Sequence, residues 1–339
     1  MRIALIGMRL VFLFFIFGAF SARAGNSSSS GNLSEQTMFK KMRVSAQKYN
    51  YSGTFVYQQA NQMRTSRITH LLEGENEIEK LEILDGNLRE YIRHNEEVTS
   101  YIPEEKTLLI EKRVTQDVFP AIFSASLDDV SVYYHFRKSS DGRVAGFFCQ
   151  SILLEPKDDL RYGYRLCVEK STGLLLRAQT LDKDNAVIEQ IFFTQIEIGK
   201  IDRNRVKSGF GNVSGWRLES AAMKLVSIHD WDVKWVPPGF KKIREMKRLV
   251  SDNSASAAEH ANKPVVARRE IEQIVFSDGL AAISVFIEPS TQSRTDGVRQ
   301  QGAMSILGKR QGDFWLTIVG EVPPKSIMQL ANSIEYNPK

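Results

Sequence analysis

The stretch "YSGTFVYQQANQMRTSRITHLLEGENEIEKLEILDGNLREYIR" (residues 51–93) decides the fold. Tyr51, Phe55 and Tyr57 alternate with polar residues, and the next apolar runs are short and end at turn residues. One such turn, Asp85-Gly86-Asn87, is a strong hairpin signal. Because no segment between the runs is long enough for a crossover helix, the pattern predicts an antiparallel meander.

The same pattern of short strands extends outward from this stretch. Further strands are expected at residues 98–102, 107–112, 130–136, 147–154, 162–168, 173–181 and 187–198. A sheet of this many strands curls, so its concave face must be covered or must enclose a cavity. A helix beginning at Ser34 and a second helix near 117–127 would cover it only in part. A helix lying on a membrane surface is the alternative for the first of these.

These observations predict an α+β fold that is mainly β. Residues 33–200 form a large, unclosed antiparallel half-barrel that is covered by helices and keeps a hydrophobic groove. Residues 201–218 are rich in Gly, Ser, Asn and basic residues, which predicts a linker. Residues 219–338 are expected to form a smaller antiparallel sheet with a C-terminal helix opened by Pro323-Pro324, and residues 251–264 are expected to be a mobile loop within it.

The first 24 residues have the pattern of a secretory signal peptide. Arg2 and Arg9 precede or begin an apolar run over residues 10–20, and the small residues before Gly25 predict cleavage after Ala24. An apolar run of this length is shorter than the roughly 20 residues that span a bilayer, although an uncleaved anchor is the alternative. Residues 25–32 would then be a flexible lead-in.

Removal of this leader also changes the charge argument. The leader carries three arginines and no acidic residue, so the formal net charge falls from +5 to +2. An exported chain with this charge is not expected to have a nucleic-acid partner. The two cysteines, Cys149 and Cys167, lie on either side of the turn at residues 156–159. In an exported protein they are expected to form a disulfide across one hairpin, the alternative being a redox couple without the C-x-x-C spacing.

No catalytic pattern stands out. The histidines are scattered, and the chain has no H-x-x-x-H, G-x-S-x-G, P-loop or G-x-G-x-x-G motif. The pairs Asp128-Asp129 and Asp158-Asp159 are adjacent in sequence, so in a strand their side chains would point to opposite faces. We therefore expect no enzyme activity, no metal and no cofactor.

The stretch "FSDGLAAISVFIEP" (residues 276–289) offers two interpretations. Ser277, Asp278 and Ser284 could form a catalytic corner, or the Asp-Gly pair could be a hairpin turn in which Gly279 supplies a positive φ. Both faces of the following run are mostly apolar, which favours a covered strand. Whether Phe286 packs inward or contacts a partner stays open at this point.

Two further groups of residues suggest binding rather than catalysis. The first lines the expected groove, although an ordinary core is the alternative: Phe55, Tyr57, Ile68, Phe119, Phe123, Tyr134 and Phe136. The second is a basic patch that could meet acidic partner segments or anionic head groups, although a solvated strand is the alternative: Lys241, Lys242, Arg244, Lys247 and Arg248.

Four segments, in order along the chain, resemble the RseB/MucB family of periplasmic sigma-E factor regulatory proteins. They are the stretch at residues 51–93, "WDVKWVPPGF" (231–240), "FSDGLAAISVFIEP" (276–289) and "TIVGEVPPKSIMQLANSIEY" (317–336). The resemblance implies that the large domain is an unclosed barrel similar to periplasmic lipoprotein carriers. It also implies a periplasmic location.

The resemblance further implies a function. The protein would bind the periplasmic region of a membrane anti-sigma factor, protect it from site-one proteolysis, and be released by a lipid-like or lipopolysaccharide signal. It would also self-associate. The residues implied at the partner interface or its support are Trp235, Gly239, Phe240, Asp278, Gly279 and Phe286. A periplasmic lipid or lipoprotein carrier is the alternative, but a carrier does not need the second domain.

Overall fold

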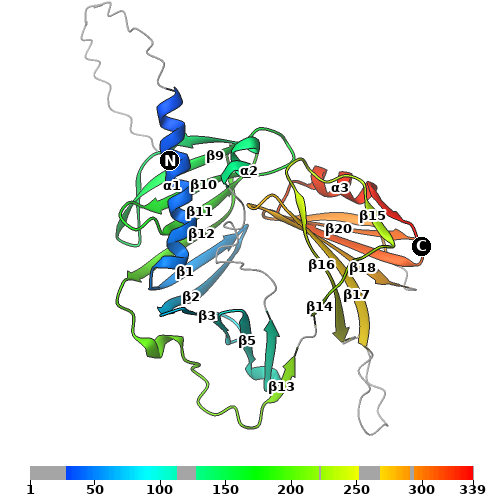
Figure 1. Ribbon diagram of the computed structural model, residues 1–339, viewed down its shortest axis with the longest axis horizontal. Helices are drawn as coiled ribbons and strands as arrows, with labels where there is room; N and C mark the ends of the chain where they lie inside the picture. The colour runs from blue at the N-terminus through cyan, green and yellow to red at the C-terminus, as the bar shows by residue number, and fades with distance from the viewer. Residues whose placement is uncertain (1–27, 113–126, 221–222, 252–267, 291–293, 339) are drawn as a thin grey trace, which may run out of the picture.

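The chain forms two large β-sheets, seen at the left and right of Figure 1, in a computed structural model that describes residues 28–112, 127–220, 223–251, 268–290 and 294–338. This arrangement confirms the predicted mainly-β class, with one large unclosed sheet and one smaller sheet. The predicted signal peptide, Phe119, Phe123 and the loop residues 252–264 lie outside the described residues.

The large sheet has 13 strands, and all of its pairs except one are antiparallel. Its strand order is β13 (Arg217–Ser220), β6 (Thr107–Lys112), β5 (Glu97–Ile102), β4 (Arg89–His94), β3 (Asn76–Ile83), β2 (Gln62–Glu73), β1 (Tyr51–Gln59), β12 (Val187–Ile198), β11 (Leu175–Leu181), β10 (Gly163–Glu169), β9 (Phe147–Pro156) and β7 (Tyr134–Lys138), with β8 (Gly142–Val144) paired to β9.

The first strand lies at the centre of this sheet and joins its two halves. Tyr51 is opposite His70 on β2 and opposite Ile198 on β12. The meander from β1 to β6 therefore extends to one side, and the strands from β12 back to β7 extend to the other. The predicted meander of residues 51–112 is confirmed, and the turn glycine Gly86 has the positive φ that its hairpin requires.

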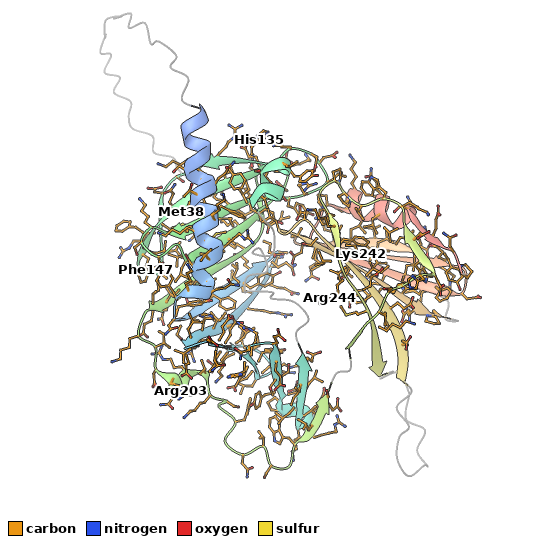
Figure 2. The ribbon with its side chains drawn as sticks, in the orientation of Figure 1. Met38, His135, Phe147, Arg203, Lys242 and Arg244 are labelled. Atoms are coloured by element: carbon orange, nitrogen blue, oxygen red, sulfur yellow. A yellow bond between two sulfur atoms is a disulfide. The ribbon has the colours of Figure 1, made fainter. Side chains whose placement is uncertain are left out.

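The helix α1 (Ser28–Lys48) crosses one face of the large sheet, with Met38 labelled on it in Figure 2. Phe39 and Met42 are fully buried against residues of β7, β9, β10 and β11. Phe39 contacts Phe136 edge to face, with ring centroids 5.5 Å apart. The helix begins at Ser28, so the predicted flexible lead-in is wrong for residues 28–32, because the chain is already helical there.

The predicted strand at residues 130–136 is also wrong in its first half. Residues 127–133 form the helix α2 (Leu127–Tyr133), and only then does β7 begin. Val130 of α2 is about 1% exposed and lies in the same buried cluster as Tyr134, the first residue of β7. The local alternation resembled a strand, but packing against the large core favours the helix.

The segment predicted as a linker packs onto the large sheet. It contains a short helix, η3 (Arg203–Val206), and Val206 is buried against Leu71. Farther along, Phe210 stacks on Tyr101 with ring centroids 5.8 Å apart. The segment then forms β13, which pairs in parallel with β6, so residues 219–220 belong to the large sheet rather than to the small one. A second short helix of this kind, η1 (Pro103–Glu105), connects β5 to β6.

The small sheet has 7 strands in the order β14 (Met223–Leu225), β16 (Lys241–Ser251), β17 (Arg268–Ser277), β18 (Ala282–Pro289), β21 (Phe314–Gly320), β20 (Met304–Gln311) and β19 (Gly297–Gln301). The helix α3 (Pro324–Asn332) packs on one face through Ile327 and Leu330, which are fully buried. A two-stranded pair, β15 (Trp231–Val233) with β22 (Ile334–Tyr336), closes the same core.

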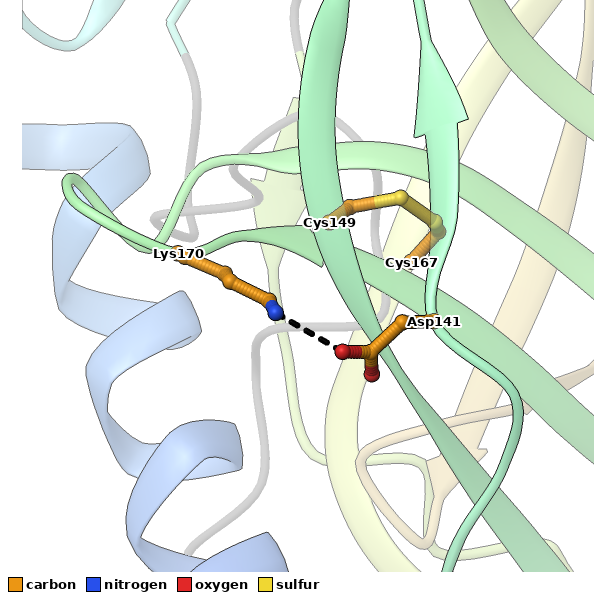
Figure 3. The surroundings of a disulfide bond; sticks show 4 residues. All are labelled: Asp141, Cys149, Cys167 and Lys170. Atoms are coloured by element: carbon orange, nitrogen blue, oxygen red, sulfur yellow. Dashed lines mark hydrogen bonds and ion pairs between the residues drawn. A yellow bond between two sulfur atoms is a disulfide. The ribbon is translucent and has the colours of Figure 1, made fainter.

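The predicted disulfide is present. Cys149 on β9 and Cys167 on β10 are bonded, with 5.4 Å between their Cα atoms, as Figure 3 shows. In the strand register Cys167 is opposite Ser151, so the bond runs diagonally between neighbouring strands of one hairpin. Both sulfur atoms lie in a buried apolar cluster with Leu176 and Phe193.

Replacing both cysteines, in Cys149→Ala/Cys167→Ala, should lower the free energy of unfolding by about 3 kcal/mol, because the unfolded chain gains the conformations that the closed loop excludes. Urea unfolding of the two proteins measures this difference. Dithiothreitol should produce a similar loss in the wild type and none in the variant. Equal unfolding midpoints for wild type and variant would contradict the expectation.

Candidate functional site

The two sheets meet where the turn between β9 and β10, residues 157–162, contacts the small sheet. Two turns of the small sheet, at residues 237–240 and 277–281, and the first turn of α3 surround it. We call this contact the junction. Ser326 of α3 donates to the carbonyl of Leu160 at 2.6 Å, and Lys325 pairs with Asp159 at the exposed edge. The junction therefore joins parts of the chain that are far apart in sequence.

Arg161 is the centre of the junction, and its side chain is completely buried. One terminal nitrogen, Nη1, donates to Oδ2 of Asp278 at 2.9 Å, and the other, Nη2, donates to the carbonyl of Pro238 at 2.5 Å. Its Nε donates to Asp158 at 3.0 Å. The guanidinium also lies 4.7 Å from the ring centre of Tyr133, a cation–π distance. A buried charge is tolerated only with such partners, so this arginine holds its three neighbours in place.

The Asp278 turn is built to receive this arginine. Oδ1 of Asp278 accepts from the amides of Leu280 and Ala281, each at 2.9 Å, while Oδ2 faces Arg161. Burial raises the pKa of Asp278, and these amides and the Arg161 charge act against that rise. Gly279 has a φ of +89°, as the hairpin interpretation predicts. Because both carboxylate oxygens are engaged within the fold, the geometry argues against a catalytic corner.

Four of the six predicted partner-interface residues lie at the junction. Asp278 and Gly279 form the turn just described, and Phe240 is buried beside them. Gly239 has a φ of +88°, and a Cβ there would lie 2.3 Å from the ring of Tyr133. Glycine is therefore required at position 239 both by its backbone angle and by the close approach of Tyr133 at the end of α2.

The other two predicted residues lie apart from the junction. Trp235 is half-buried against the small core, and its carbonyl accepts from the hydroxyl of Ser333 at 2.9 Å. Phe286 is opposite Gln273 and Thr317 in the strand register and points away from the face that α3 covers. It is half-buried. We call the face of the small sheet that carries Phe286, opposite the face covered by α3, the second face. Its residues are Arg244, Val275, Ser284, Phe286, Thr317 and Val319.

The predicted basic patch is divided between two faces of β16. Lys242 is opposite the core residue Phe276, whereas Arg244 is opposite Val275 on the second face, because a bulge separates them. Figure 2 labels both side chains along this strand. On the Lys242 side, Glu245 pairs with Lys242 at 2.7 Å, and Lys247 pairs with Glu270 and Glu272. The lysines on this side are thus neutralised within the sheet. In the strand register, the positions of Lys241 and Arg248 lie on the same face of β16 as that of Arg244.

The predicted groove residues do not form one open groove among the residues that the structure describes. Tyr134 and Phe136 are buried beneath α1, and Phe55 and Ile68 are buried in a separate cluster with Phe193. Tyr57 is half-buried and faces the small sheet. A cavity of about 640 Å³ does lie between the large sheet and residues 204–209, but its lining is mostly polar.

A second contact between the sheets, which we call the seam, involves the ends of β1 and β12. Nε2 of Gln59 donates to the carbonyl of Gln301 at 2.9 Å and to the carboxylate of Glu189 at 3.2 Å. Burial, followed by the nearby charge of Glu189, raises the pKa of Glu321 to about 7. Burial and Glu189 also raise the pKa of Tyr57. The seam therefore holds two carboxyl groups, Glu189 of the large sheet and the partly buried Glu321 after β21, that are close enough for the charge of the first to raise the pKa of the second.

The sequence motifs did not identify Arg161, Glu189 or Glu321. Arg161 comes directly after residues typical of a turn, and Glu321 comes directly after a strand, so neither position suggests a special role. Their roles depend on contacts with residues more than 100 positions away.

Within the described ranges, no helix is long and apolar enough to cross a membrane. In the same ranges, no group of three or more metal-ligating side chains comes together.

Comparison with known proteins adds the family. The profile of the MucB/RseB N-terminal domain matches residues 34–210, and the profile of the MucB/RseB C-terminal domain matches residues 226–335. The chain is 25% identical over 312 residues to the sigma-E factor regulatory protein RseB of Haemophilus influenzae, covering 91% of this chain and 93% of that protein. It is 26% identical over 291 residues to the sigma factor AlgU regulatory protein MucB of Pseudomonas aeruginosa, covering 84% and 85%.

The fold is similar to a solved one. The Pseudomonas aeruginosa MucA/MucB complex contains a chain that superposes with a TM-score of 0.69 at 23% identity, covering 90% of this chain and 100% of that chain. At this identity the likeness shows the fold.

Asp278→Asn should lower the free energy of unfolding by about 3 kcal/mol, because it removes the buried one of the two carboxylates that pair with the buried Arg161 charge. Urea unfolding measures the loss. Asp159→Asn removes the exposed partner of Lys325 at the same junction and is the control that should leave the curve nearly unchanged. In the double variant Arg161→Met/Asp278→Leu the loss should be smaller than the sum of the two single losses. An Asp278→Asn protein as stable as the wild type would refute this role.

The Glu321 carboxyl should make stability fall as the pH rises. Its folded pKa of about 7 lies above the ordinary 4.5, so the folded state binds this proton more tightly. Its contribution is full below about pH 4.5 and is lost as the pH rises through 7, a change of at most about 3 kcal/mol. Urea unfolding between pH 4.5 and 8 should show the wild type losing stability relative to Glu321→Gln. Glu189→Gln should move the fall to lower pH, and parallel profiles of wild type and Glu321→Gln would contradict the assignment.

Proposed function

Because this chain belongs to the MucB/RseB family, we propose that it is a periplasmic negative regulator of an extracytoplasmic stress sigma factor. It binds the periplasmic region of a membrane anti-sigma factor and protects that region from site-one proteolysis. A lipid-like or lipopolysaccharide signal releases it. It acts by binding and not as an enzyme, and it reaches the periplasm through the leader at residues 1–24.

The observation that carries this proposal is the presence of both family domains, joined through a buried contact. The two profiles cover most of the chain, and the junction between the sheets is centred on the completely buried Arg161. A carrier needs only a half-barrel, so a second sheet held in a defined orientation favours a regulator. The complex of the similar protein MucB with MucA supports the same class of partner.

The second face of the small sheet is the partner surface that we propose. Phe286 is its central aromatic residue, with Thr317 beside it in the register. Aromatic side chains are frequent anchors in protein interfaces. The residues Gly239, Phe240, Asp278 and Gly279 support this surface indirectly, because they hold the small sheet against the large one.

Release by a lipid is consistent with the way α1 is packed. Phe39 of α1 covers Phe136, and Tyr134 lies in the same buried cluster. An acyl chain that reaches these residues must replace the contacts of α1. A ligand that binds this altered form better than the partner-bound form weakens partner binding to the same extent, by linkage. Self-association of the chain is part of the same proposal.

Isothermal titration of the mature protein with the periplasmic fragment of the anti-sigma factor tests the proposal. Phe286→Ala should weaken binding about tenfold or more, as expected for loss of a central aromatic contact. Met328→Ala is the matched control, since Met328 is an exposed apolar side chain on α3, on the opposite side of the small sheet. Circular dichroism confirms that both variants are folded.

Each alternative outcome has a clear meaning. Equal affinity of Phe286→Ala and Met328→Ala would exclude the second face as the partner surface. Failure of the wild type to bind any anti-sigma fragment, together with efficient transfer of an acylated lipoprotein, would instead support a carrier.

A further inference from the structure

We propose that the large sheet carries an oxyanion site formed by Arg165 and Arg177 beside the disulfide. Its ligand is a phosphate-class group, either a free ion or a phosphorylated head group. The site lies in a cavity of about 380 Å³. The cavity is lined by Ser139, Ser140, Asp141, Gly142, Ser151, Arg165, Cys167, Arg177 and Gln179.

The two guanidinium groups enter the cavity from neighbouring strands. Arg165 of β10 is opposite Gln179 of β11, and Arg177 of β11 is opposite Cys167 of β10. The two arginines are therefore diagonal neighbours on one face of the hairpin, a spacing of roughly 7–8 Å between backbones that long side chains can bridge.

Neither arginine forms an ion pair with a carboxylate among the residues that the structure describes. Arg165 makes one long hydrogen bond, from Nη1 to the side-chain oxygen of Gln179 at 3.3 Å. Nε of Arg177 is buried and has no hydrogen-bond partner. The cavity contains one carboxylate, Asp141, and Lys170 binds it at 2.7 Å, as Figure 3 shows. The positive charge of the two arginines is thus left for a ligand.

The available groups match the chemistry of a phosphate. A guanidinium presents its N–H donors in a planar fork that suits phosphate oxygens. The face of Arg177 is occupied by Phe192, whose ring centre lies 5.7 Å from the Arg177 Cζ atom, so its N–H edge is the part left for an anion. The hydroxyl groups of Ser140 and Ser151 line the same cavity and supply neutral donors.

The disulfide makes this site rigid. Gly142 lies directly over it, since a Cβ at this position would be 3.6 Å from the sulfur of Cys167 and 3.7 Å from that of Cys149. The loop of residues 139–142 therefore packs on the disulfide, and the same bond joins the two strands of the hairpin that bears Arg165. A site that is formed before its ligand arrives loses less freedom on binding.

The cavity of about 640 Å³ on the same sheet is a weaker candidate for an anion site, because its positive charges are already paired. It also contains cations, but Lys80 pairs with Glu82 at 3.3 Å and with Glu90 at 3.0 Å. Arg205 pairs with Glu197 at 2.8 Å. The charges in that cavity are compensated within the fold, whereas those beside the disulfide are not.

Calorimetric titration of the mature protein with inorganic phosphate, in a chloride buffer of low ionic strength, tests the site. We expect saturable binding that weakens at least tenfold in Arg165→Gln and in Arg177→Gln. Arg143→Gln is the matched control: it removes the same charge from β8, outside the cavity lining, and should leave the affinity unchanged. Thermal melting verifies folding, and Arg165→Gln keeps the test valid if Arg177→Gln fails to fold.

Absence of phosphate binding by the wild type, or equal binding by the wild type and both cavity variants, would overturn the proposal. Co-sedimentation with vesicles identifies the source of the group. A head-group ligand predicts binding to phosphatidylglycerol vesicles, but not to phosphatidylcholine vesicles, that Arg165→Gln abolishes and inorganic phosphate inhibits. A free-ion ligand predicts phosphate binding without vesicle binding. The site is argued from its own residues, and only its head-group form rests on the lipid signal of the proposed function. Because the experiment uses no anti-sigma factor, its failure would leave the proposed binding of that partner untouched.

Discussion

The buried guanidinium of Arg161 is the constraint on which the arrangement of the two sheets depends. An unpaired charge in this position would be strongly destabilising, so its partners must stay within hydrogen-bonding distance. Those partners are Asp158 on the large sheet and Asp278 and the Pro238 carbonyl on the small one. One side chain therefore links the orientation of the two sheets to the conformation of three turns. The apolar insertion of Leu280 into the large core reinforces the same orientation.

The junction and the seam join the sheets through different interactions: an ion pair at the junction, and hydrogen bonds beside two carboxyl groups at the seam. The junction is an ion pair between Arg161 and Asp278 with aromatic rings beside the guanidinium, and the charge of Arg161 and two backbone amides oppose the rise that burial causes in the pKa of Asp278. The seam brings Glu189 and Glu321 together, and burial makes the second carboxyl hold its proton near neutrality. Protonation near neutrality therefore acts on the seam through Glu321.

Local sequence signals predicted the elements well and the contacts between them poorly. The meander at residues 51–112, the cysteine hairpin and the turn at Asp278 depend on alternation and turn chemistry, which neighbouring residues determine. The helix α2 was missed because its packing against the large core overrides a strand-like local pattern. The pairing of Arg161 with Asp278 spans 117 positions, and nothing in either local sequence indicates the other.

This difference changes how the candidate site is understood. Sequence resemblance grouped Gly239, Phe240, Asp278 and Gly279 as residues near a partner or its support, and the structure places all four at the junction between the sheets. A partner that binds the small sheet would then be sensitive to the large sheet through these residues. A ligand of the large sheet can in turn influence that partner only if it alters the junction, the seam or the packing of α1. Regulation in a protein of this kind therefore depends on the contacts between its sheets, because a rigid half-barrel alone has no means of transmitting the presence of its ligand.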